Sequence, residues 1–176
     1  SSGLNCQVIR NGSNRGFTVA INQVISASTG DVLILNSDAY VCCDVVSILS
    51  EHLRRDPNIG AAGPLEYRLD AIGPYNDIRL CNELRRWHGE LPRNADAVAA
   101  ELRKTAVFEA KRVLSYFCTL LNRKALTAVG PLDERLVSGL AADNLHCNRL
   151  TAAGWFVGVA HDALVLHQGS ASFKRA

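Results

Sequence analysis

Hydrophobic residues along the chain follow two alternating patterns. Short apolar runs, typical of buried strands, alternate with stretches in which apolar residues recur every three or four positions, as on one face of a helix. The pattern predicts strands at residues 6–10, 32–36, 59–64, 113–121, 155–160 and 163–167. It predicts helices at residues 17–28, 45–55, 95–110, 123–129 and 141–153. Alternating strands and helices favour an α/β fold built on parallel strands.

Residues that begin or end helices lie at the expected boundaries. Asp44 can cap the helix at 45–55, and Gly30 and Gly154 follow two other predicted helices, where glycine commonly ends them. The chain of 176 residues has the length of about one domain, so we expect residues 1–176 to form a single domain.

The composition narrows the class of protein. A hydrophobic content of 48% with 20% charged residues is typical of a soluble globular protein. A net charge of +2 gives no reason to expect a nucleic acid partner. No apolar run approaches the roughly 20 residues that cross a bilayer. Six cysteines without a Cys-x-x-Cys pair argue against a zinc site and favour a reducing, cytoplasmic location.

Polar residues follow the most apolar predicted strand. Asn36, Ser37 and Asp38 come directly after Val32–Leu35, and sheets of this class bind ligands beyond the carboxyl ends of their strands. Asp38 is either a turn residue or a ligand of Mg²⁺ or Mn²⁺ that neutralises a diphosphate.

A histidine ends the last predicted strand. His167 is either a partly buried core residue or a second metal ligand, and His161 and Asp162 are alternatives for that role.

Two charged residues lie in the predicted helix at 141–153. Asp143, near its start, either interacts favourably with the helix N-terminus or acts as a general base. Arg149 can pair with a carboxylate or a phosphate.

Four segments, in this order along the chain, resemble one family. They are NRGFTVAINQVISASTGDVLILNSDAYV from residue 14, VGPLDERL from 129, ADNLHCNRLTAAGW from 142 and VLHQGSASF from 165. Together they resemble the family 2 glycosyltransferases with the GT-A fold, especially the rhamnosyltransferase-like members. The resemblance implies a mixed, mainly parallel sheet flanked by helices, with a donor side at about 1–64 and an acceptor side at about 113–176.

The resemblance also implies a role for each matching residue. Asp143 is then the catalytic base. Asp38 and His167 hold a divalent cation, Mg²⁺ or Mn²⁺. The implied substrate-binding residues are Asn14, Gly16, Asn22, Asn36 and Arg149. The implied reaction is an inverting transfer of a hexose, with rhamnose the first candidate, from a dTDP- or UDP-linked donor. The acceptor is a cell-surface glycan or lipid-linked glycan, reached at the inner face of the membrane, and the arginine-rich stretch 79–93 can serve peripheral membrane association.

Two departures from the family pattern keep an alternative open. Ala142 and Leu145 replace acidic residues of the family motif, and the sequence enters after the family's first strand and helix, so we expect an N-terminally truncated domain. The alternative is a non-catalytic GT-A-like domain that binds sugar or nucleotide or partners an active subunit. An unrelated α/β nucleotide-binding domain is a third interpretation, which leaves the order of the motifs unexplained.

Overall fold

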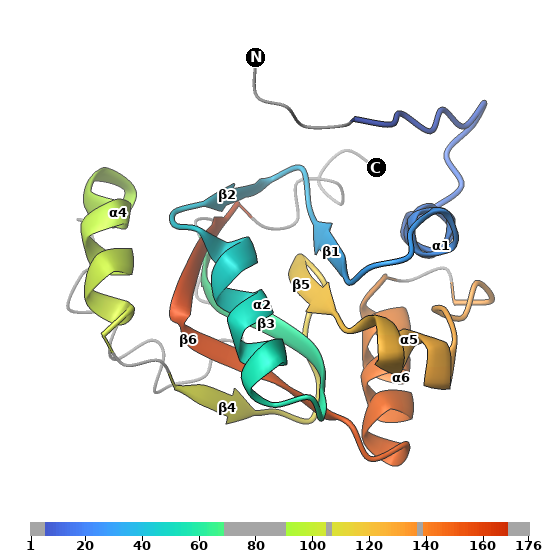
Figure 1. Ribbon diagram of the computed structural model, residues 1–176. Coiled ribbons are helices and arrows are strands. Elements are labelled where there is room, and N and C mark those ends of the chain that lie inside the picture. The colour runs from blue at the N-terminus through green and yellow to red at the C-terminus, as the bar shows by residue number, and fades with distance from the viewer. Residues whose placement is uncertain (1–5, 69–90, 105–106, 137–138, 169–176) are drawn as a thin grey trace.

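The computed structural model describes residues 6–68, 91–104, 107–136 and 139–168 (Figure 1). In chain order the elements are α1 (Phe17–Ala27), β1 (Val32–Leu35), β2 (Ala39–Val41), α2 (Val45–Arg55), β3 (Ile59–Arg68), α4 (Leu91–Leu102), β4 (Phe108–Ala110), β5 (Cys118–Leu121), α5 (Arg123–Val129), α6 (Gly139–Ala152) and β6 (Phe156–His167).

The described strands form one sheet. Their order is β1-β5-β3-β6-β2, and β4 pairs with β6. The predicted α/β class with a mixed sheet is therefore confirmed. The expectation of mainly parallel pairing is wrong, because β3 with β6 is the parallel pair among the described pairings and the other four are antiparallel. Hydrophobic patterning indicates where a strand can form, but the direction of its neighbour depends on how the chain returns to the sheet.

Helices cover both faces of this sheet (Figure 1). Neighbouring residues of a strand point to opposite faces, so β5 directs Leu120 into the core cluster that contains α2 and Leu121 into the cluster that contains α1 and α6. Leu49 of α2 is completely buried, and burial of such a side chain contributes about 2 kcal/mol.

The local signals that predicted two helix boundaries are present. Asp44 caps α2 by accepting a hydrogen bond of 3.2 Å from the backbone nitrogen of Ser47. Gly154 follows α6 in a left-handed conformation, with φ of 86°, which favours glycine. None of the helices in the described part of the chain is long and apolar enough to cross a membrane.

Residues 6–10 do not form the expected strand. No strand is assigned there, and Val8 and Ile9 are 66% and 44% exposed. An apolar pattern alone does not make a strand when no neighbouring strand takes up its hydrogen bonds.

The region predicted as a helix at 95–110 contains two different elements. The helix, α4, ends at Leu102, and residues 108–110 form β4 on the edge of β6. The short strand β2, at 39–41, was not predicted. The arginine-rich stretch 79–93 lies outside the residues whose side chains are described.

The two strands predicted at 155–160 and 163–167 are one continuous strand, β6. The pairing of β6 with β3 is irregular between the two predicted strands, since Pro64 is opposite Ala160 and Leu65 is opposite Leu164. The strand nevertheless continues, and its polar residues there have partners. His161 lies 2.9 Å from the Glu109 carboxylate, and Asp162 lies 2.7 Å from His52. Polar residues with partners of this kind can stay inside a strand.

Candidate functional site

Asp38 and His167 come from distant parts of the sequence and lie together. After β1 the chain turns into β2, which pairs with the end of β6 so that Ala39 is opposite His167. Asp38 Oδ1 is 3.4 Å from His167 Nε2. The backbone nitrogen of Gln168 also donates to the Asp38 carbonyl at 3.0 Å, which fixes the two chain segments against each other. The two residues predicted as metal ligands therefore lie next to each other, and their binding of a metal stays a prediction.

Two further residues, which the sequence analysis missed, orient His167. Glu66 of β3 places Oε1 2.6 Å from His167 Nδ1. The ring of Phe117 stacks on the imidazole with a centroid distance of 4.7 Å and an angle of 14° between the planes. These contacts direct Nε2 toward Asp38.

The arrangement fits a cation. Because a carboxylate only accepts hydrogen bonds, His167 Nδ1 carries a proton and donates to Glu66. A neutral imidazole then directs the lone pair of Nε2 toward Asp38 Oδ1. Two acceptors that face each other are stabilised by a positive charge between them, either a proton or a metal ion. Carboxylate oxygen and imidazole nitrogen are both ligands for divalent cations.

The protein supplies few ligands at this point. Among the described residues no group of three or more His, Cys, Asp or Glu side chains could hold a metal ion. Glu66 lies on the opposite nitrogen of the imidazole, so it cannot join Asp38 on one ion. Mg²⁺ is often bound by one or two carboxylates together with substrate phosphates. Asp38 provides one carboxylate here, and His167 adds an imidazole nitrogen beside it.

Asp143 lies in a different environment. It is 4% exposed, and its Oδ2 accepts a hydrogen bond of 3.0 Å from the backbone nitrogen of Tyr116. Its Oδ1 is buried without a hydrogen-bond partner in the described part of the chain. Burial raises the pKa of Asp143 to about 7, and the Tyr116 amide offsets part of that rise. A carboxyl group that ionises near neutral pH has the property that a general base requires.

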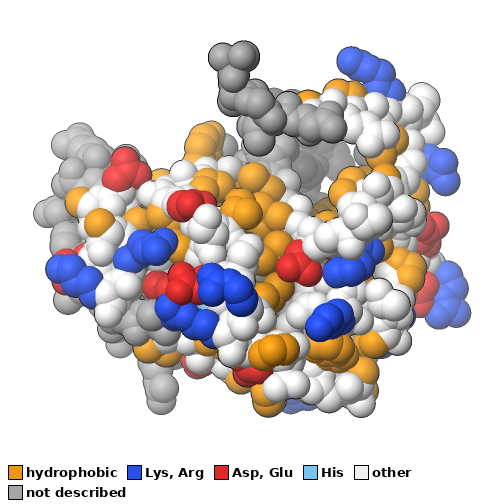
Figure 2. Space-filling model, viewed as in Figure 1, with side chains coloured by type: hydrophobic (Ala, Val, Ile, Leu, Met, Phe, Trp, Pro, Cys, Tyr) orange, Lys and Arg blue, Asp and Glu red, His pale blue; other side chains and the backbone are white. Residues whose placement is uncertain are grey.

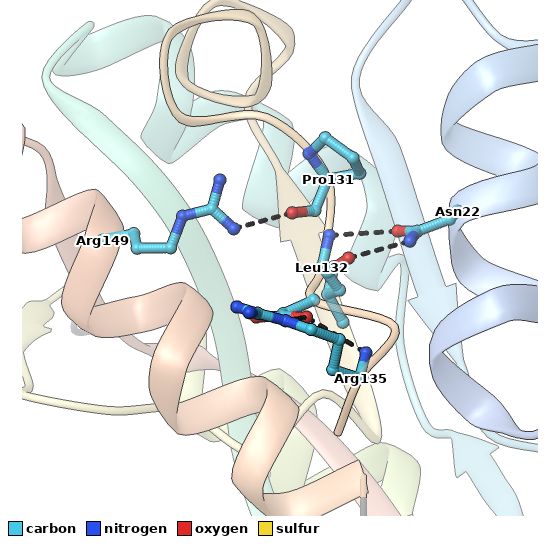
Figure 3. Close-up of polar contacts among 6 residues, drawn as sticks. Asn22, Pro131, Leu132, Arg135 and Arg149 are labelled. Atoms are coloured by element: carbon cyan, nitrogen blue, oxygen red, sulfur yellow. Dashed lines mark hydrogen bonds and ion pairs between the residues drawn. The ribbon is translucent and has the colours of Figure 1, made fainter. Parts of the chain in front are cut away.

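Asn22 and Arg149 hold the loop at 130–136 from opposite sides (Figure 3). The Asn22 amide exchanges two hydrogen bonds with the backbone of Leu132, at 2.9 and 3.0 Å, and donates another to Glu134. Arg149 donates to the Pro131 carbonyl at 2.8 Å. Both side chains therefore position this loop, and their predicted contact with substrate stays a prediction.

The remaining predicted substrate-binding residues lie in turns. Asn14 Oδ1 accepts a hydrogen bond of 2.9 Å from the nitrogen of Gly16, whose φ of 80° favours glycine, immediately before α1. Asn36 is half-buried and donates its backbone N–H to the Phe117 carbonyl at 2.7 Å. Their contact with a donor molecule also stays a prediction.

The dipeptide Tyr116–Phe117 joins the two parts of the site. The Tyr116 nitrogen holds Asp143, the Phe117 ring holds His167, and the Phe117 carbonyl holds Asn36. Sequence reasoning could not identify this role, because both residues belong to an apolar stretch that predicted only a buried strand.

A cavity of about 340 Å³ lies between α1 and β1, and Asn36 and Ser37 form part of its lining. The rest of the lining is apolar, so the cavity by itself does not supply the charges that a diphosphate requires. Figure 2 shows hydrophobic side chains gathered at the middle of the face in view, between α2 and β1.

Comparisons with known proteins give the family and the fold of this chain. A family profile described as Glycosyl transferase family 2 matches residues 2–130, well over half of the chain. Asp38 lies within the matched residues, whereas Asp143, Arg149 and His167 follow them. No sequence match is found among curated proteins.

Solved structures share the fold. There are 51 matching chains, so the similarity does not depend on one structure. One is the crystal structure of GalNAc-T7 with UDP, GalNAc and Mn²⁺, which is 13% identical, with a TM-score of 0.64, over 90% of this chain. The match spans 31% of that protein's chain. The similarity confirms the GT-A-like α/β fold, and the profile match shows that the chain belongs to glycosyl transferase family 2.

Proposed function

We propose that this chain carries the site of an inverting, metal-assisted glycosyltransferase that moves a hexose from a nucleotide diphosphate sugar to a glycan. The observation that carries the proposal is the pairing of Asp38 with His167 at 3.4 Å, in an orientation set by Glu66 and Phe117. The matching structure of GalNAc-T7 contains UDP and Mn²⁺, which supports a nucleotide-linked donor.

The side chains divide the chemistry between two places. Asp38 and His167 would hold Mg²⁺ or Mn²⁺, which would stabilise the negative charge of the departing nucleotide diphosphate. Asp143 would accept the proton of the acceptor hydroxyl as that oxygen attacks the anomeric carbon. Attack from the face opposite the leaving group inverts the configuration. Asn22 and Arg149 would act through the loop that they hold, because their polar groups already contact it.

The finer assignments depend on the sequence motifs. They favour dTDP-rhamnose as the first donor to test, with UDP-hexoses next, and a cell-surface or lipid-linked glycan as the acceptor. Cytoplasmic location, with peripheral association at the inner face of a membrane, belongs to the same proposal.

One observation favours a second candidate function, a non-catalytic domain that binds nucleotide or sugar. Asp143 is 4% exposed, and a base must reach its substrate. Ala142 and Leu145 next to it carry no charge that could orient an acceptor. This candidate predicts nucleotide binding without turnover.

A donor assay separates the two candidates. The protein is incubated with Mn²⁺ and either dTDP-rhamnose or a UDP-hexose, and release of free nucleotide diphosphate is measured with and without chelator. We expect release from one donor that chelation stops and that Asp143→Asn reduces. Glu51→Gln, which removes an exposed carboxylate of α2, is the control for loss of charge. Nucleotide binding with no release from any donor would favour the non-catalytic candidate.

A further inference from the structure

A buried hydrogen-bond chain lies beside Asp143. The Tyr116 hydroxyl is 2.7 Å from His146 Nδ1, and His146 Nε2 is 3.2 Å from the carbonyl oxygen of Gly130. Tyr116 is fully buried and His146 is 1% exposed. Neither residue was singled out by the sequence, and the proposed chemistry assigns neither of them a role.

The partners fix the direction of each hydrogen bond. A carbonyl oxygen only accepts, so His146 Nε2 carries a proton and donates to Gly130. Nδ1 of a neutral imidazole is then an acceptor, and the Tyr116 hydroxyl donates to it. Burial, with a smaller effect of Arg149, lowers the pKa of His146 to about 4, so this neutral form is present near neutral pH.

Tyr116 contacts the same helix through its hydroxyl, to which Cys147 Sγ also donates at 3.6 Å, and through its backbone nitrogen. Its side chain binds His146 and its backbone nitrogen binds Asp143, three residues earlier on α6. Residues three apart lie on one face of a helix, so Tyr116 lies along that face. A ring that is held by His146 therefore also restrains the backbone of Tyr116, whose N–H contacts the carboxylate.

The loop at 130–136 takes part in the same arrangement. His146 and Arg149, also three residues apart on α6, bind the carbonyls of Gly130 and Pro131. Gly130 has a φ of 77°, which favours glycine, and a Cβ there would lie 3.2 Å from the Arg149 guanidinium, so the loop and α6 approach closely here. His146 therefore connects this loop to the residue that holds Asp143.

We propose that His146 is a positioning residue, which fixes Tyr116 through its hydroxyl so that the Tyr116 N–H is held against the carboxylate of Asp143. The functional part of this inference rests on the proposed role of Asp143 as the base, whereas the positioning is a property of the folded chain.

The ionisation of Asp143 provides a direct readout. The groups that face this cluster are Tyr116 before β5 and Asp143, Cys147 and Arg149 on α6. The Tyr116 N–H lowers the pKa of Asp143, so its loss, with burial retained, must raise that pKa.

The experiment measures two quantities by NMR of the whole chain. The pKa of Asp143 is obtained from the carboxyl signal of ¹³C-labelled aspartate, identified by its absence in Asp143→Asn. Hydrogen exchange of the Tyr116 amide is measured in parallel. The variants are His146→Leu, Tyr116→Phe and the double variant. The control is His52→Leu, which removes a buried, hydrogen-bonded histidine that contacts Asp162 in another part of the core.

We expect His146→Leu to raise the pKa of Asp143 by about one unit, the effect of one hydrogen bond, and to speed exchange of the Tyr116 amide about tenfold. Tyr116→Phe should change both in the same direction, and the double variant should add little. If His146→Leu does not fold, Tyr116→Phe alone decides. Unchanged values, or equal changes in His52→Leu, would overturn the proposal. Retained turnover in Asp143→Asn would instead overturn the proposed function, without altering this result.

Discussion

The two parts of the site handle charge in opposite ways. At the end of β6, His167 lies between two carboxylates, and the side chains of Asp38 and Glu66 are 18% and 21% exposed. On α6, Asp143 is enclosed, its pKa is raised to about 7, and its one hydrogen bond comes from a backbone amide. Two partly exposed carboxylates around a buried histidine suit an ion and a diphosphate, whereas an enclosed carboxyl suits the uptake of a proton.

The difference also shows how one short segment can build both environments. Tyr116 and Phe117 are adjacent in the chain, and they contact Asp143 and His167 respectively. Their backbone and rings provide the contacts, while the ionisable groups come from distant elements. The spacing between the two parts of the candidate site is therefore set by the buried turn that leads into β5.

The largest effect is expected from a change at Asp143, which should reduce turnover without reducing nucleotide binding. Asp143→Asn should reduce sugar transfer or donor hydrolysis by roughly 10²- to 10⁴-fold, the usual contribution of a general base, and should leave Mn²⁺-dependent nucleotide binding intact. In the parent protein kcat/KM should rise with pH toward about 7, where Asp143 loses its proton. Steady-state rates over a pH series, with calorimetric nucleotide binding, test both. Loss of nucleotide binding in this variant would show that the two parts are not separate.

The second prediction concerns stability and pH. The pKa of Asp143 is raised in the folded chain from 3.8 to about 7, so the folded state holds a proton that the unfolded state releases between these values. This group therefore stabilises the fold most below about pH 4, and its contribution is lost as pH rises through about 7.

From pH 5 to pH 8 the contribution of Asp143 should fall by roughly 2–3 kcal/mol. Urea unfolding of the parent protein and of Asp143→Asn at these two pH values measures it. The Asn variant should lose less stability over this range. An equal loss in both proteins would mean that Asp143 is not protonated at pH 5.

The third prediction tests how His167 is oriented. Glu66→Ala removes the acceptor of Nδ1 and should weaken Mn²⁺ binding about 10- to 100-fold, as loss of such an orienting carboxylate usually does. Glu109→Ala is a matched control, because Glu109 contacts His161 of the same strand at 2.9 Å. Calorimetric titration with Mn²⁺ measures both. Equal affinities in the two variants would contradict the account of His167.

The smallest expected effect concerns the loop at 130–136. Asn22→Ala leaves both backbone groups of Leu132 without their partner and should lower the free energy of unfolding by about 1–3 kcal/mol. Gln23 lies on the same helix as Asn22, and Gln23→Ala removes only exposed hydrogen bonds to Asn11. This variant should change the free energy of unfolding little. Urea unfolding compares the two variants. A small effect of Asn22→Ala would mean that the loop does not depend on this amide.

Much of the fold could be predicted because local signals were strong. The cap at Asp44 and the glycine after α6 marked their helices correctly. Strand direction could not be predicted, since it depends on how the chain returns to the sheet. The continuity of β6 could not be predicted either, because it depends on Glu109 and His52, which are distant in sequence.

The candidate site, too, could be predicted only in part from the sequence. Motif order pointed to Asp38, His167 and Asp143, whose side chains carry recognisable chemistry. The contacts of Glu66, Tyr116 and His146 could not be predicted, because they form only when β3, α6 and the residues before β5 come together in the fold. Asn22 and Arg149 were predicted to contact substrate. The sequence did not show that both side chains bind the loop at 130–136.

The most direct test of the central claim is calorimetric titration of UDP and of dTDP, with and without Mn²⁺, into the parent protein and Asp38→Ala. The account predicts that one of these nucleotides binds the parent protein only when Mn²⁺ is present, and that Asp38→Ala loses this binding while Glu51→Gln keeps it. Binding that is independent of the metal, or equally strong in Asp38→Ala, would contradict the assignment of Asp38 and His167 as the site for the cation and the diphosphate.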